Sequence, residues 1–221
     1  MARLLYKQDS TAFYRRLTRR HIRLCGQVKG GASYAQNIQP KLDNLQQKSQ
    51  TLSATEDVYE NTYDDLLLKD SYLDDSVRTL FERTKQYDRE NGSNISVLLF
   101  PDLTFSDIVN MPYSEEPKKV SSLIQKLETL DANHELRPLA GMLQQRVDAV
   151  NTALDARQQA ADAVRRARVD EELAKNELRA QYEANYLDAR KFLGKQVAES
   201  LFPKVSSKTA KKQENDIIIE P

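Results

Sequence analysis

The chain has 221 residues, enough for one large domain or two small ones. Apolar residues make up 39% and charged residues 30%, so the chain is poorer in apolar and richer in charged side chains than a typical globular domain. Lys plus Arg and Asp plus Glu both number 33, which excludes a net charge that would attract the whole molecule to nucleic acid or to an anionic membrane.

The first predicted helix covers about residues 10–24 and lies within a basic segment, residues 1–31. This segment has eight Lys and Arg side chains against one Asp. The arginines of its helix are Arg15, Arg16, Arg19, Arg20 and Arg23. Phosphate contacts need only such positive charge, so one hypothesis is nucleic-acid binding. We prefer docking on residues 56–75, of the same chain or of another subunit, because eight acids against one Lys balance the basic segment there.

A second helix of about residues 40–90 carries the clearest pattern in the sequence. A large apolar or aromatic residue recurs at every seventh position. These residues, here called the bundle seam, are Leu45, Leu52, Tyr59, Leu66, Leu73, Leu80 and Tyr87. A seven-residue repeat is typical of left-handed supercoiled helices. Half of the companion row is polar, which favours a helical bundle over a free two-stranded coiled coil. A capping-box pattern leaves open a break near residues 51–55.

Residues 91–116 differ from the helices around them, because Gly and two Pro residues interrupt them. We expect the apolar run at 95–100 to close one end of the bundle, and the alternative is a binding lip. Thr104 followed by Asp107 predicts the cap of a single helical turn.

Two further helices are predicted, at about 117–130 and 136–202. The first has apolar residues at spacings of three and four, as an amphipathic helix does. In the second, the apolar stripe becomes charged and alanine-rich at 165–175. The helix either leaves the bundle there or packs through small residues and ion pairs. Pro203 is expected to end it.

The last residues, 204–221, form a polar segment that ends in the sequence DIIIEP. The polar part cannot build a core, so we expect it to be flexible. Ile217, Ile218 and Ile219 form a β-branched run suited to extended pairing. We predict that this run adds to a sheet edge of a partner protein. The alternatives are a tail that folds back on its own bundle and a chain end without a role.

No motif for catalysis or cofactor binding is present: the sequence lacks a phosphate-binding loop, a nucleophile elbow and a paired-histidine metal motif. One Cys and two His provide too few ligands for a structural zinc site. Cys25 and His21 share a helix face, and we interpret them as core residues. Asp70 and Glu56 lie on the polar row of the second helix, where they point inward or meet water or arginine. We predict no catalytic residue, no metal and no cofactor.

These observations predict an all-α fold: an elongated antiparallel helical bundle with coiled-coil character, made of two long helices and two shorter ones. The predicted parts are a basic arm at 1–31, a bundle at 32–203 and a tail at 204–221. We predict a non-enzymatic scaffold or adaptor that binds protein partners and forms a homo-oligomer. A lone cysteine suits the cytoplasm, and no run approaches the roughly 20 apolar residues of a membrane span. The alternative function is nucleic-acid association through the basic helix.

Overall fold

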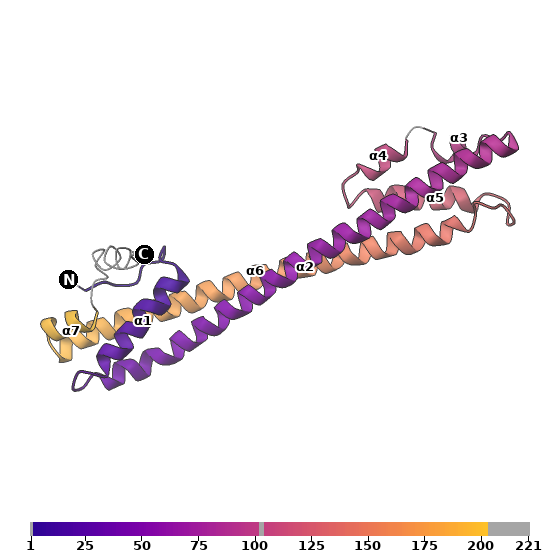
Figure 1. Ribbon diagram of the computed structural model, residues 1–221. Coiled ribbons are helices and arrows are strands. Elements are labelled where there is room, and N and C mark those ends of the chain that lie inside the picture. Colours follow the sequence, from indigo (N-terminus) through magenta and orange to yellow (C-terminus); the bar gives the residue numbers. More distant parts are fainter. Residues whose placement is uncertain (1, 102–103, 203–221) are drawn as a thin grey trace, which may run out of the picture. The chain divides into compact units, whose positions relative to one another are not determined.

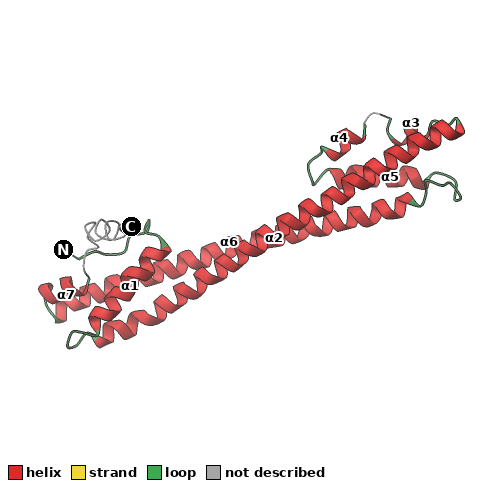
Figure 2. Cartoon of the chain, in the orientation of Figure 1, coloured by secondary structure: helices red, strands yellow, loops and turns green. Residues whose placement is uncertain are grey.

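The computed structural model describes residues 2–101 and 104–202 and shows an all-α fold (Figures 1 and 2). The helices in these residues are α1 (Thr11–Cys25), α2 (Ala32–Asn91), α3 (Ile95–Leu99), α4 (Phe105–Val109), α5 (Glu116–Glu128), α6 (Leu139–Phe192) and α7 (Lys195–Leu201). The described residues form no strand. The predicted all-α fold with two long helices is therefore confirmed. None of the described helices has the length and apolarity needed to cross a membrane.

The chain divides into two compact units, and α2 and α6 each contribute one segment to each unit. Unit 1 contains Met1–Ala54 and Arg165–Pro221, and unit 2 contains Thr55–Val164. Each unit has its own hydrophobic core. Since an apolar stripe on one helix must be buried against another element, each unit supplies additional short helices beside α2 and α6.

The core of unit 1 is built by α1, the start of α2, the end of α6 and α7. Its fully buried large side chains are Tyr14, Leu17, Ile38, Leu45, Tyr182 and Phe202. Two ion pairs fix the direction of the long helices in this unit. Lys41 pairs with Glu177 at 3.0 Å and Lys48 with Asp170 at 2.7 Å. A step of seven residues forward on α2 thus matches seven residues backward on α6, so the two helices run antiparallel.

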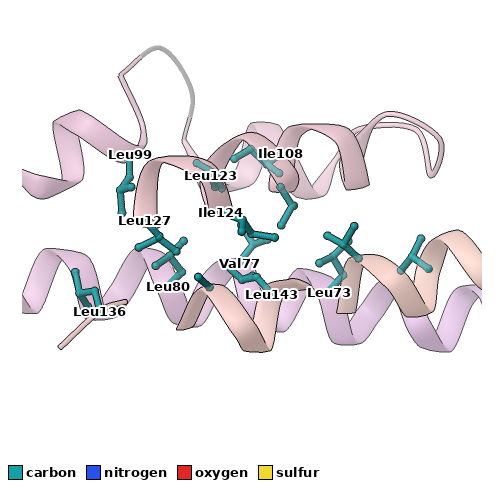
Figure 3. Close-up of a cluster of buried hydrophobic side chains, with 14 of the residues drawn as sticks. Leu73, Val77, Leu80, Leu99, Ile108, Leu123, Ile124, Leu127, Leu136 and Leu143 are labelled. Carbon is teal, nitrogen blue, oxygen red and sulfur yellow. The ribbon is translucent and has the colours of Figure 1, made fainter. Parts of the chain in front are cut away.

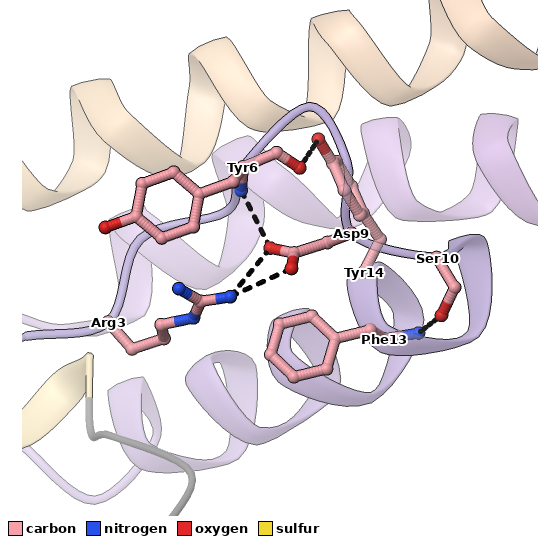
Figure 4. A network of polar contacts seen from close by, with 6 residues as sticks. All are labelled: Arg3, Tyr6, Asp9, Ser10, Phe13 and Tyr14. Carbon is pink, nitrogen blue, oxygen red and sulfur yellow. Dashed lines mark hydrogen bonds and ion pairs between the residues drawn. The ribbon is translucent and has the colours of Figure 1, made fainter.

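The residues before α1 are held by a polar network around Asp9 (Figure 4). The Arg3 guanidinium donates to Oδ1 of Asp9 at 2.8 Å, and the Tyr6 amide donates to Oδ2 at 2.8 Å. The Tyr14 hydroxyl donates to the Tyr6 carbonyl at 3.0 Å, and Ser10 Oγ accepts from the amide of the third residue of α1. The segment from Arg3 to Asp9 is therefore anchored on the helix that follows it.

The core of unit 2 lies between α2, α5 and the first part of α6, and α3 and α4 cover it (Figure 3). The labelled side chains in Figure 3 are Leu73, Val77, Leu80, Leu99, Ile108, Leu123, Ile124, Leu127, Leu136 and Leu143. Residues 91–116 contribute Leu99 and Ile108 to this core, both fully buried. The predicted cap of α4 is present, since Thr104 and Asp107 form a reciprocal capping box. Residues 91–116, called the connector below, therefore pack on the core of unit 2.

Two helix boundaries differ clearly from the sequence prediction. First, α2 begins at Ala32 instead of near residue 40 and continues through Pro40. Proline lacks an amide donor and disfavours a helix interior, but Ile38 and Leu42 are buried on either side of it. Packing thus holds the helix on both sides of Pro40. The capping pattern at 51–55 does not interrupt α2 either.

The prediction of one helix up to residue 202 is wrong. Helix α6 ends at Phe192, and Gly194 takes a φ of +81°, a conformation that side-chain-bearing residues rarely adopt. The turn allows α7 to place Ala198 and Leu201 in the core of unit 1. The charged stretch 165–175 remains helical, and its buried Ala167 and Ala174 show that it packs through small residues.

Candidate functional site

Three carboxyl groups meet in unit 2, from one face of α2 and the first residue of α5. Asp70 and Asp74 are four residues apart and therefore share a helix face. Glu116 begins α5. One oxygen atom from each of the three residues lies within 4.8 Å of the others. Glu116 is completely buried, with 0% of its surface exposed, whereas the two aspartates are half-buried. These three residues are called the acidic cluster below.

Four carboxyl oxygens of the acidic cluster have no hydrogen-bond donor among the described residues. Both carboxylate oxygens of Glu116, and Oδ1 of Asp70 and of Asp74, are buried without a hydrogen-bond partner. Burial, and then the charges of Asp74 and Asp70, raises the pKa of Glu116 to about 9. Burial also raises the pKa of both aspartates. Since an unpaired buried charge is costly, the cluster must take up either protons or a cation.

A group of tyrosines and an arginine lies near the acidic cluster. The Arg157 guanidinium of α6 lies over the rings of Tyr59, at 4.8 Å, and Tyr63, at 4.3 Å, and it donates to the Tyr59 hydroxyl at 3.1 Å. Burial raises the pKa of Tyr113, and the negative charge of Asp70 and a hydrogen bond with Tyr63 raise it further. The tyrosine group therefore adjoins the Asp70 side of the cluster.

His21 and Cys25 lie in the core of unit 1, as we interpreted them. Nδ1 of His21 donates to the Leu201 carbonyl at 3.1 Å, and Nε2 accepts from the Asn185 amide at 3.3 Å. Burial lowers the pKa of His21 to about 4 and raises the pKa of Cys25 to about 11. At neutral pH the imidazole and the thiol are both uncharged. Because the thiolate is the reactive form of cysteine, this pair is suited to packing.

The arginines of the basic arm line one face of α1. Arg16, Arg19, Arg20 and Arg23 are exposed, and Arg15 is half-buried. All of them except Arg20 line a shallow groove, together with Ala12. The groove contains no acidic side chain among its lining residues. The opposite face of α1 lies in the core of unit 1. The helix therefore presents positive charge to solvent from a fixed position.

The bundle seam contributes to both cores. Leu45 is buried in unit 1, and Leu66, Leu73 and Leu80 are buried in unit 2. Leu52, Tyr59 and Tyr87 are half-buried. The predicted partner peptide, Ile217 to Ile219, lies outside the described residues and stays a hypothesis.

Large apolar and aromatic side chains also lie on the surface of the long helices. On α2 they are Val58, Tyr63, Leu67, Leu68 and Tyr72, and on α6 they are Val169, Leu173, Leu187 and Phe192. Val169 and Leu173 are one helical turn apart and are 59% and 56% exposed. Such exposed pairs are candidates for contact with another protein.

Sequence reasoning found one member of the acidic cluster and missed two. Asp70 was recognised on the polar row of the second helix, but Asp74 and Glu116 were not. The spacing of Asp70 and Asp74 was a usable signal, whereas nothing local marks Glu116 as their neighbour. Comparison of the chain with protein-family models, with curated protein sequences and with solved structures found no match.

Proposed function

We propose that this chain is a non-enzymatic helical scaffold that associates with a second copy of itself through α6 and displays further helix faces to protein partners. The observation that carries the proposal is the exposure of more than half of Val169 and of Leu173. Removing these side chains from water by contact with another protein would be favourable, because buried apolar surface lowers the free energy. A cytoplasmic location belongs to the proposal, because a lone buried cysteine suits a reducing compartment.

The charges around Val169 favour a second copy as its partner. Arg166 lies three residues before Val169 and Glu172 lies three residues after it, so both are on its side of the helix. When two such helices run antiparallel about a two-fold axis at Val169, Arg166 of each faces Glu172 of the other. Val169 then meets its copy at the axis, and Leu173 lies one turn beyond it. A self-complementary patch of this kind is what a two-fold interface requires.

Light scattering combined with size-exclusion chromatography tests the proposal over a range of protein concentrations. We expect a dimer that dissociates on dilution. The double substitution Val169→Ser with Leu173→Ser should weaken association at least tenfold without unfolding the chain, because both side chains are exposed. The matched control is Leu68→Ser with Tyr72→Ser, which removes a comparable exposed pair from α2.

A charge exchange tests whether the two α6 helices run antiparallel in the dimer. Arg166→Glu and Glu172→Arg should each weaken self-association, and a mixture of the two variants should associate better than either alone. A wild-type chain that is monomeric at every concentration contradicts the proposal. So does a Val169→Ser, Leu173→Ser variant that associates as tightly as the wild type.

The arginine groove of α1 favours a second candidate function, association with nucleic acid. The test uses substitutions instead of a deletion, because Tyr14 and Leu17 of the same helix are buried in the core. Replacing Arg16, Arg19 and Arg23 with Gln should weaken binding to a duplex of random sequence. It should also reduce the slope of log K against log salt by about 0.9 for each lost phosphate contact. An unchanged affinity and slope rule this function out.

A further inference from the structure

We propose that Asp70, Asp74 and Glu116 form a binding site for one hard divalent cation of the Ca²⁺ type. The site lies inside unit 2 and is independent of the surfaces discussed above. All three ligands are carboxylates, and carboxylate oxygen is the ligand that Ca²⁺ prefers in proteins. The cluster contains no sulfur or imidazole ligand, so soft metals are disfavoured.

The spacing of the oxygens fits this ion. Ca²⁺ binds oxygen at 2.3–2.6 Å, so two oxygens on one ion are separated by at most about 5 Å. The three ligand atoms of the cluster all lie within 4.8 Å of one another. A small adjustment of side-chain torsions is therefore enough for all three to reach a common ion.

The second observation is that Glu116 is buried without a hydrogen-bond donor. This side chain is 0% exposed, both of its oxygens lack a hydrogen-bond donor, and it is directed at Asp70 and Asp74. Buried carboxylates are normally paired or bound to a metal. In the described chain no Lys or Arg side chain forms an ion pair with the cluster. Arg78 acts on Asp74 only at longer range, and Asp75 adds further negative charge.

The backbone holds the three ligands from two separate elements. Asp70 and Asp74 lie one turn apart on α2, and the amide of Glu116 donates to the Pro112 carbonyl at 3.1 Å. Pro117 is buried next to it and restricts the first turn of α5. Asp70 and Asp74 are only half-buried, so water that completes the coordination shell would reach the ion from their side. A bound cation therefore joins α5 to α2 and stabilises unit 2.

Tb³⁺ luminescence provides a probe for the site, because Tb³⁺ replaces Ca²⁺ and is excited through nearby tyrosine, and the chain has no Trp. Chelator-treated full-length protein is titrated with Tb³⁺, and Ca²⁺ is then added as the competitor. We expect saturable emission from one site, displacement by Ca²⁺ with a Kd of about 10⁻⁵ to 10⁻³ M, and a Tm that rises by several degrees in saturating Ca²⁺.

The substitution Glu116→Gln keeps the side-chain volume and removes the buried charge. We expect it to weaken Ca²⁺ binding at least 100-fold while the Tm without metal stays at or above the wild-type value. Asp74→Asn should have the same effect on binding and serves as a second variant. Asp64→Asn is the matched control, because it removes an exposed acid from the same helix, and it should change the Kd less than twofold.

Two results would overturn the proposal. If millimolar Ca²⁺ neither displaces Tb³⁺ nor raises the Tm of the wild type, the carboxyl groups share protons instead of a cation. If Glu116→Gln binds Ca²⁺ as tightly as the wild type, the ion binds elsewhere on the acidic surface.

Discussion

Nδ1 of His21 donates a hydrogen bond to the carbonyl oxygen of Leu201, 180 residues later in the chain, at 3.1 Å. The imidazole also lies against the ring of Phe202, with centroids 4.2 Å apart. One buried side chain of α1 thus anchors the end of α7. The bond requires a neutral imidazole whose Nε2 accepts from Asn185, so protonation at Nε2 removes an acceptor in the core.

We therefore expect unit 1 to lose stability in mild acid. The folded pKa of His21 is about 4 and its ordinary value is 6.5, so the unfolded chain binds this proton first. The contribution is fully present above pH 6.5 and is lost as the pH falls to about 4, at a cost on the order of 3 kcal/mol. The difference in unfolding free energy between wild type and His21→Gln, measured from pH 7.5 to 4, isolates this residue. A difference that does not change with pH would contradict the prediction.

Cys25 should react slowly with thiol reagents in the folded chain. Its side chain is buried, and burial raises the pKa of the thiol to about 11, so the thiolate is scarce at pH 8. Labelling with a disulfide reagent should be at least about 100-fold slower in native than in denatured protein. The control is Cys25→Ser combined with Ser71→Cys, which places a thiol at an exposed position of α2. Equal rates for the two native proteins would show that the core around Cys25 opens readily.

Two adjacent leucines of α2 should differ strongly in their contribution to stability. Leu66 belongs to the bundle seam and is 2% exposed, whereas Leu67 is 38% exposed. We expect Leu66→Ala to cost about 2–5 kcal/mol, because it leaves a cavity in unit 2. Leu67→Ala should change the unfolding free energy by less than about 0.5 kcal/mol. Denaturant unfolding of the two variants measures the contrast, and similar losses would mean that the helix faces are assigned incorrectly.

Asp88 should hold the start of the connector between α2 and α5. Its carboxylate accepts from the Ser93 hydroxyl and from the amides of Ile95 and Ser96. Burial opposes the charged form, but these hydrogen bonds outweigh it and lower the pKa of Asp88 to about 2. We expect Asp88→Ala to destabilise unit 2 by about 1–3 kcal/mol.

Hydrogen exchange provides the local readout for Asp88, since the amides of Ile95 and Ser96 should lose protection in Asp88→Ala. Because the folded pKa is lowered, the contribution of Asp88 is present above about pH 4 and is lost between pH 3.8 and 2. Asp64→Asn is the surface control and should leave both amides protected. Unchanged protection in Asp88→Ala would show that the apolar contacts of α3 alone order the connector.

The sequence predicted those features that depend on short-range periodicity. The seven-residue repeat placed Leu45, Leu66, Leu73 and Leu80 on one side of α2, and all four are buried. The capping pattern at Thr104 and Asp107 was also sufficient to predict the start of α4, because both partners of a capping box lie within one turn.

Features that depend on packing between distant segments were missed. The seven-residue repeat predicts a helix only from about residue 40, but α2 begins at Ala32, and the buried residues on both sides of Pro40 sustain it. The sequence contains both Gly194 and Pro203 as possible helix ends, and the prediction ends the helix at Pro203. No local feature shows that the helix stops at the glycine instead. Glu116 meets Asp70 and Asp74 only after α5 has packed on α2. Periodicity along one helix cannot specify that pairing.

The ion pairs of unit 1 also constrain how the length of the chain can change. Lys41 and Lys48 are matched one to one with Glu177 and Asp170. One residue inserted between Lys41 and Lys48 would rotate the side chains beyond it by about 100° relative to those before it. Seven inserted residues would nearly restore the helix face but shift the partners by two turns. Within this unit, a length change between 41 and 48 therefore keeps both ion pairs only when a matching change occurs between 170 and 177.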